Sequence, residues 1–129
     1  MLNPDSVGRT FHSAKSFPVT ASEIAAFAAV IGEDDLTVAP PTFSIRISLE
    51  QSQDVLSDPQ VGIDWSRVVH GDQKFEIIRP IVAGDVLTCS STIENHKVLA
   101  GNEIVTVRSD IHSKDELVGS SWSTLVVRA

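Results

Sequence analysis

The sequence predicts an α+β domain in which helices cover one face of an antiparallel β-sheet. Apolar residues recur at helical spacing only in the first half of the chain, as far as Leu56. From Arg67 to the C-terminus they fall instead in extended segments that are separated by short turns. Strands that follow one another through short turns pair antiparallel, so this separation of helices from strands argues against parallel βαβ units.

Length and composition are those of one compact domain that spans residues 1–129. A chain of 129 residues can bury a core of its own but is short for two ordinary domains. Hydrophobic residues make up 42% and charged residues 21%, which is typical of globular proteins rather than disordered ones. We therefore expect the whole chain to fold as a single domain.

The charge of the chain argues against a nucleic-acid partner. The formal net charge is −7, and the ten Lys and Arg residues are scattered along the sequence. Binding to a phosphate backbone needs a clustered cationic face, which this distribution does not predict. Arg67, Lys74 and Arg79 are the nearest approach to a basic patch that could meet an anionic acyl carrier.

Cysteine content and hydropathy favour a cytoplasmic location. The chain has one cysteine, Cys89, which excludes an internal disulfide and is expected to be a packing residue in a strand. The first residues, Met1 to Arg9, lack the apolar segment of a signal peptide. No later apolar run approaches the ~20 residues that a membrane-spanning helix needs.

The first elements expected along the chain are a short strand at Gly8–His12 and a helix. Thr20 and Glu23 have the spacing of a capping box, in which the hydroxyl and the carboxylate satisfy backbone donors at a helix start. Gly32 is the expected end of this helix. Its apolar face is predicted to carry Ile24, Phe27, Ala28 and Ile31.

The segment from Ile45 to Leu56 has two interpretations. Ile45, Ile47 and Leu49 alternate as in a strand, whereas Leu49, Ser52, Gln53 and Leu56 share one face of a helix. We interpret it as a second helix that follows Pro40-Pro41 and covers roughly Phe43 to Leu56. Pro59 and Gly62 then end it.

Four strands are expected after this helix. Pro80 and Ala83-Gly84-Asp85 supply turn residues after the first strand, and a reversal is expected between His96 and Gly101. Lys114-Asp115-Glu116 leads into the last strand. The predicted strands cover Arg67–Arg79, Val86–Asn95, Glu103–His112 and Leu117–Val127.

One of the four histidines has a sequence context that suggests a role in a site. His70 precedes Gly71 at the start of a strand, and a glycine there permits close approach of a ligand or a neighbouring backbone. His12, His96 and His112 stand alone and are expected to be structural or solvated. His70 is therefore a candidate site residue.

A run of carboxylates is the second candidate. Glu33, Asp34 and Asp35 follow the stop at Gly32, and paired carboxylates can do acid–base work where like charge or burial separates their pKa values. A charge run at this place is more often a solvated loop. No spacing typical of metal ligands, nucleophile elbows or phosphate loops is present in the sequence, so neither metal nor cofactor is expected.

Three segments carry a resemblance to a known family. Ala39–Phe43, Arg67–Phe75 and Arg79–Leu87, together with Val7-Gly8-Arg9, occur in the order and spacing of the FAS1-like members of the MaoC-like (R)-3-hydroxyacyl dehydratases. The resemblance implies a hot-dog fold, in which a curved antiparallel sheet wraps a long central helix. It also implies that two such units pair into one continuous sheet, with an acyl thioester of acyl carrier protein or coenzyme A entering between them.

The catalytic pattern of the family is incomplete in this chain. Active relatives carry a pattern Gly-Asp-x-Asn-Pro-x-His, and the matching segment is Gly32–Leu36. Glu33 takes the place of the Asp, Asp35 that of the Asn, and nothing supplies the His. Only three residues separate this segment from Ala39, where the family has a longer loop.

The resemblance therefore implies a non-catalytic, groove-forming subunit of a heteromeric dehydratase of fatty-acid metabolism, whose hot-dog partner carries the catalytic Asp and His. Pro41, Thr42 and Phe43 would line or support the acyl groove. His70 and Gly71 would lie at its mouth near the partner.

Two alternatives stay open at this point. Asp35 or Glu33 could approach His70 across the seam of a homodimer and form an unusual enoyl-CoA hydratase, because geometry rather than sequence position defines an acid–base pair. The chain could also be an acyl-thioester-binding hot-dog protein without lyase activity.

Overall fold

The computed structural model describes residues 1–129, except for the side chain of Val55. The chain forms two helices, two short 3-10 turns and an antiparallel sheet. The helices are α1 (Ala21–Val30) and α2 (Ile45–Leu56), and the 3-10 turns are Pro4–Ser6 and Trp65–Arg67. The strands are β1 (Thr10–His12), β2 (Phe17–Pro18), β3 (Val68–Ile77), β4 (Val86–Leu99), β5 (Asn102–Ser113) and β6 (Glu116–Val127).

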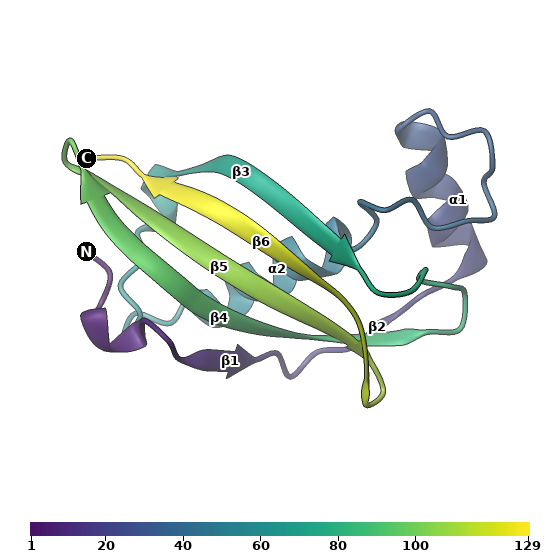
Figure 1. The fold of residues 1–129 in the computed structure, drawn as a ribbon, viewed down its shortest axis with the longest axis horizontal. Coiled ribbons are helices and arrows are strands. Elements are labelled where there is room, and N and C mark those ends of the chain that lie inside the picture. The colour runs from purple at the N-terminus through teal and green to yellow at the C-terminus, as the bar shows by residue number, and fades with distance from the viewer.

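The sheet has the strand order β1-β4-β5-β6-β3, with β2 also paired to β4. All pairings are antiparallel. Figure 1 shows α2 running along one face of the sheet, whereas α1 stands beyond one end of it. β3 forms one edge of the sheet and β1 the other, which confirms the expected architecture of a sheet around a central helix.

Helix α2 begins at Ile45, two residues later than expected. The prolines hold a turn before it, in which the Phe43 amide donates to the Pro40 carbonyl at 2.9 Å. The helical interpretation of the ambiguous segment is confirmed. Of the face that was expected to be shared, Ser52 and Leu56 are buried, whereas Leu49 and Gln53 are exposed. No helix of the described residues is long and apolar enough to span a membrane.

The start of α1 has one half of the expected capping box. Thr20 Oγ1 accepts a hydrogen bond from the Glu23 amide at 3.2 Å. The Glu23 carboxylate lies 3.3 Å from the guanidinium of Arg46 in α2 instead. The helix ends before Gly32, whose φ of +81° is unfavourable for residues with a Cβ atom. Ile31, expected on the apolar face, is 46% exposed because it caps the helix.

The core consists of two apolar clusters, one near each end of α2. Phe43 is central to the first, where Phe17 and Phe27 contact it edge to face with ring centroids 6.5 and 5.5 Å away. Cys89 belongs to this cluster as a buried packing residue. The second surrounds Leu56 and includes Leu2 from the N-terminal segment. Both ends of α2 are therefore anchored to the sheet by apolar contacts.

Strand β4 is longer than expected. It runs to Leu99, and the reversal is confined to Ala100-Gly101, both of which have positive φ angles. Such a two-residue turn matches the twist of a hairpin. A bulge between Ile93 and Asn95 interrupts the alternation of the strand, which explains why the sequence pattern predicts an earlier end.

Candidate functional site

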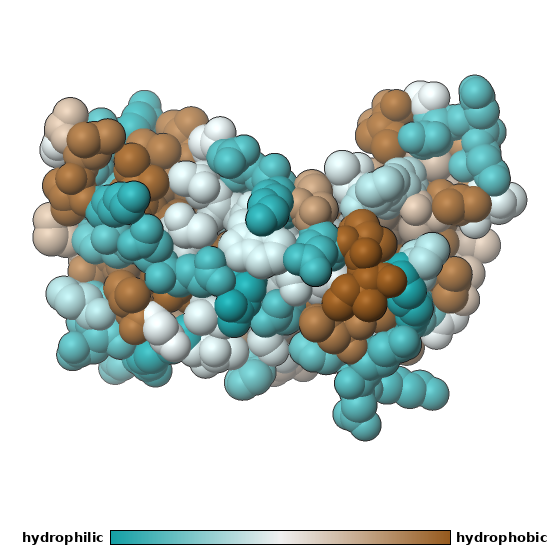
Figure 2. Space-filling view, in the orientation of Figure 1, coloured by the Kyte–Doolittle hydropathy of each residue, from teal (hydrophilic) through white to brown (hydrophobic). Residues whose placement is uncertain are grey.

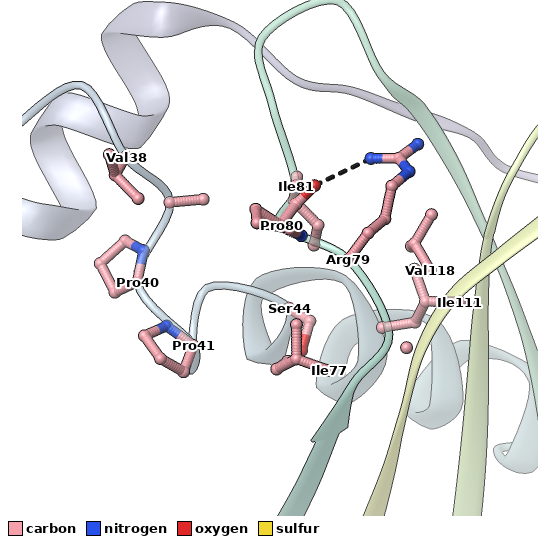
Figure 3. Close-up of a pocket in the computed structure, with 12 residues that line it drawn as sticks. Val38, Pro40, Pro41, Ser44, Ile77, Arg79, Pro80, Ile81, Ile111 and Val118 are labelled. Carbon is pink, nitrogen blue, oxygen red and sulfur yellow. Dashed lines mark hydrogen bonds between the residues drawn. The ribbon is translucent and has the colours of Figure 1, made fainter.

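A pocket of about 250 Å³ opens at the end of the sheet that lies nearer α1. One wall is the loop before α2, and the other walls come from the end of β3, the connection to β4, and the ends of β5 and β6 (Figure 3). Figure 2 shows a notch in the surface between the body of the molecule and the part that carries α1. The loop contributes Val38, Ala39, Pro40 and Pro41, and the N-cap position of α2 contributes Ser44. The remaining lining is mainly Ile77, Pro80, Ile81, Ile111 and Val118.

The sequence makes this pocket apolar. The prolines on both sides present rings and no amide donors to the space. Gly119 has no side chain, and a Cβ atom there would meet the Glu76 carbonyl oxygen at 3.0 Å. An apolar lining with few polar groups is typical of sites that bind the hydrocarbon part of a small ligand.

Arg79 is the ionisable residue of the lining, and it is held by two carboxylates. Its Nη1 and Nη2 donate to the two oxygens of Asp85, each at 2.9 Å, and its Nε donates to Glu116 at 2.9 Å. Figure 3 shows the guanidinium pointing away from Ser44 and Ile77. Arg79 therefore braces the wall of the pocket and is not free to act on a ligand.

Asp85 is the centre of this brace. It is 8% exposed and also accepts hydrogen bonds from the Val82 amide and the Ser113 hydroxyl, each at 2.9 Å. The hydrogen bonds from Arg79 lower the pKa of Asp85 to about 2, and the same contacts raise the pKa of Arg79. Both groups stay ionised at neutral pH, so neither serves as a general acid or base.

His70 and Gly71 lie on β3 outside this pocket. A bulge between His70 and Asp72 displaces the strand, and His70 Nε2 lies 3.0 Å from the Asp72 carbonyl oxygen. Together with Gln73 these residues line a shallow surface depression. Seven residues of extended strand place His70 about 20 Å from Ile77. His70 is exposed on the edge strand, where a second chain could reach it.

Asp35 lies in an exposed turn that leads into the pocket wall. Its Oδ1 accepts hydrogen bonds from the Thr37 hydroxyl at 2.6 Å and the Thr37 amide at 2.9 Å. These two bonds lower the pKa of Asp35. Glu33 and Asp34 are also exposed. Among the described residues, no hydrogen bond joins any of the three carboxylates to His70.

The segment Pro41–Phe43 contributes to the pocket unequally. Pro41 lines it directly. Thr42 is exposed and its carbonyl accepts the Ile45 amide at 3.0 Å, whereas Phe43 is buried in the core behind the loop. Thr42 and Phe43 therefore support the loop from which Pro41 faces the pocket.

The basic residues that the sequence places near β3 each have a different neighbour. Arg67 lies 3.5 Å from Asp64, Lys74 stands 4.6 Å over the ring of Trp122, and Arg79 is bound by Asp85. Two of these three cations are paired with carboxylates, which reduces the positive charge that β3 offers to an anionic carrier. In the part of the chain that the structure describes, no three His, Cys, Asp or Glu residues converge as metal ligands.

Comparison with known proteins decides the family. Residues 5–119 match the family model of the FAS1-like dehydratase domain region. The chain belongs to this family. A UPF0336 protein of Streptomyces griseus is 42% identical to this FAS1-like chain, over 99% of the chain and 96% of the relative. A UPF0336 protein of Thermobifida fusca is 39% identical, over 98% of this chain and 94% of the relative.

The alignment with the Streptomyces griseus relative also contains positions that this chain lacks. It extends over 144 positions, whereas the chain has 129 residues, so at least 15 positions have no counterpart here.

Solved structures confirm the hot-dog fold. One chain of the HadBC (3R-hydroxyacyl-ACP dehydratase) complex from Mycobacterium tuberculosis superposes with a TM-score of 0.84 at 26% identity, covering 97% of this chain and 99% of that one. A MaoC-like dehydratase from Rhodospirillum rubrum superposes with a TM-score of 0.69 at 21% identity, covering 99% of this chain and 97% of that one. The FAS1-like chain is thus an α+β hot-dog protein of the dehydratase type.

Proposed function

We propose that this chain is the non-catalytic, acyl-groove-forming subunit of a heteromeric (R)-3-hydroxyacyl dehydratase of fatty-acid metabolism. Its substrate is an acyl thioester of acyl carrier protein or coenzyme A. The observation that carries the proposal is the pocket itself, which is apolar and contains Arg79, an ionisable residue already neutralised by Asp85 and Glu116.

Removal of water from a 3-hydroxyacyl thioester needs two proton transfers. An acid must protonate the leaving hydroxyl while a base removes the proton at C2, and both groups must be held in position. Asp35 is bound to Thr37 in an exposed turn, and His70 lies on a different part of the surface. The acid–base pair therefore comes from a second chain.

The free edge of the sheet supports pairing with such a chain. β3 is the last strand of the sheet, and Val69, Ile77 and Ile78 are exposed along it. An unpaired edge beside exposed apolar residues favours association. The HadBC and ChsH1-ChsH2 proteins of Mycobacterium tuberculosis, whose chains share this fold, are complexes of two different proteins.

In this arrangement the chain binds and orients the acyl part of the substrate. The prolines and aliphatic residues of the pocket exclude water from the alkyl chain. His70 and Gly71, on the pairing edge, lie near the partner and support the substrate or the partner's loop. Pro41 faces the alkyl chain, with Thr42 and Phe43 holding its loop.

The test compares hydration of trans-2-enoyl-CoA by this chain alone, by a partner that carries the family's Asp and His, and by the mixture. Loss of a positioned general acid or base lowers rates by ~10²–10⁴-fold, so the isolated chain is expected to show no appreciable turnover. The mixture is expected to exceed the partner alone. Asp35→Asn and His70→Ala are expected to leave the mixture active, because neither group transfers a proton.

Three outcomes contradict this proposal in different ways. Turnover by the isolated chain that disappears in Asp35→Asn or His70→Ala favours a homodimeric hydratase with an unusual acid–base pair. Binding of acyl-CoA without any effect on the partner's activity favours a thioester-binding protein without a lyase role. Failure to bind acyl-CoA or partner overturns the acyl-groove assignment.

A further inference from the structure

A row of buried hydroxyl groups crosses the sheet directly behind the pocket. In the pocket floor, Ile77, Gly119 and Ile111 are cross-strand neighbours on β3, β6 and β5. Two residues further along the same strands, and therefore on the same face, Phe75, Ser121 and Ser109 are cross-strand neighbours in the same way. Ser91 on β4 continues this row beyond Ser109.

Helix α2 supplies hydroxyls from the other side. Ser44 lines the pocket, and Ser48 and Ser52 follow it at intervals of four residues on the same helix face. Ser52 Oγ lies 3.1 Å from Ser91 Oγ and 3.0 Å from Ser109 Oγ, and it also bonds to the Ser48 carbonyl. We name Ser48, Ser52, Ser91, Ser109 and Ser121 the hydroxyl row.

Two members of the hydroxyl row have no partner. Ser48 is 1% exposed and Ser121 is 0% exposed, and the hydroxyl of neither makes a hydrogen bond to any described residue. They occupy the layer that follows Ser44 and Gly119 of the pocket. Buried hydroxyls in native proteins almost always have a partner, and ordered water supplies it where the protein does not.

We propose that Ser48 and Ser121 hold ordered water at the inner end of the pocket and thereby limit the length of the acyl chain that it accepts. This inference rests on the proposed acyl-binding function. An acyl chain that stops short of the hydroxyl row leaves this water in place. A longer chain displaces it with methylene groups, which leaves both hydroxyls buried and unpaired, and that loss opposes binding.

The experiment uses the assembled complex with the catalytic partner and a graded set of substrates: crotonyl-CoA, trans-2-octenoyl-CoA and trans-2-dodecenoyl-CoA. The variants are Ser48→Ala, Ser121→Ala and the double variant. We expect the double variant to raise the ratio of kcat/KM for the dodecenoyl substrate to kcat/KM for crotonyl-CoA by about tenfold, because no hydroxyl is left unpaired by the longer chain. Each single variant is expected to give a smaller shift in the same direction.

Ser6→Ala is the matched control. Ser6 is also 0% exposed with an unpaired hydroxyl among the described residues, but it lies in the N-terminal 3-10 turn, outside the pocket lining. It is expected to leave the chain-length profile unchanged. Circular dichroism and thermal unfolding verify that each variant folds. If the double variant does not fold, the two single variants test the inference.

The outcomes separate this inference from the function on which it rests. An unchanged chain-length profile in folded variants of an active complex overturns the role of the hydroxyl row and leaves the acyl-groove function standing. The same shift of the chain-length profile in Ser6→Ala also overturns the role of the hydroxyl row, because the shift would then not depend on the pocket. Absence of acyl-CoA binding and of turnover at every chain length overturns both.

Discussion

At the scale of single residues, Asp85 joins the connection between β3 and β4 to the end of β5. It binds Arg79 through both carboxylate oxygens and accepts the Ser113 hydroxyl at 2.9 Å. The pKa of Asp85 is about 2 in the folded protein, below its ordinary value of 3.8. Its contribution to stability is therefore complete above a pH of about 4 and is lost as the pH falls toward 2.

Asp85→Asn tests this contribution. The Arg79 side chain is 28% exposed, so solvent screening reduces the gain, and we expect the variant to lose about 1–2 kcal/mol of unfolding free energy at neutral pH. Urea unfolding between neutral pH and pH 2 measures the difference, which is expected to shrink as the pH falls below 4. Glu33→Gln, at an exposed carboxylate outside the ion pairs of the described residues, is the control. A constant difference across this pH range contradicts the assignment.

Arg79 shows what single-residue patterns can and cannot predict. The sequence places it beside Pro80 in a segment that resembles the family, and the structure puts both residues in the pocket wall. From the sequence alone, its positive charge groups Arg79 with Arg67 and Lys74 as the nearest approach to a basic patch. Asp85 and Glu116 together neutralise that charge. Glu116 does so from a strand 37 residues away, and no local pattern indicates this contact.

At the scale of elements, β3 is the strand whose outer edge is free for pairing. Ile78, directly after it, is 54% exposed, and so is Val98 near the tip of the β4–β5 hairpin. If two chains pair along β3, a charge at position 78 is placed in the interface, whereas a charge at position 98 stays in solvent. We expect Ile78→Lys to weaken self-association of the purified chain by at least about tenfold, as a buried unpaired charge does.

Sedimentation equilibrium over a range of protein concentrations measures this effect. Val98→Lys, with the same change in chemistry at equal exposure, is expected to associate like the unchanged chain. Equal weakening by both substitutions shows a non-specific effect of charge. A chain that stays monomeric at micromolar concentration, without any substitution, contradicts self-pairing altogether.

The elements themselves follow closely from local sequence, and their departures have local causes. The prolines before Phe43 hold a turn, which delays the start of α2 to Ile45. The bulge after Ile93 hides the continuation of β4. Periodicity predicts an element well where the backbone is regular, and it fails at bulges and turns because these shift the alternation of side chains.

At the scale of the whole molecule, the pocket depends on register between distant strands. Ile111, Gly119 and Ile77 meet in its floor because β5, β6 and β3 pair in one particular alignment. Bulges at Gly71 and after Ile111 contribute to that alignment. The sequence predicts Pro41 on the acyl side through the family resemblance, but the residues of the floor emerge only when the strands are paired.

If self-pairing and pairing with the proposed catalytic partner both use β3, the two kinds of pairing compete for the same edge of the sheet. The other edge is occupied by the short β1, and β2 also lies on β4. Pairing of one chain with itself and with a partner is then mutually exclusive. We expect that adding increasing amounts of the partner dissociates the self-associated species. The product is a complex in which every pair has one copy of each chain.

Native mass spectrometry and light scattering follow this exchange directly. The self-associated species is expected to decline as the mixed species rises, and the thermal unfolding temperature of the mixture is expected to rise with partner concentration, because the partner binds only the folded chain. Ile78→Lys is expected to weaken both kinds of pairing, and Val98→Lys neither. An assembly in which the self-associated species persists with the partner bound to it contradicts a shared edge and places the partner on another surface.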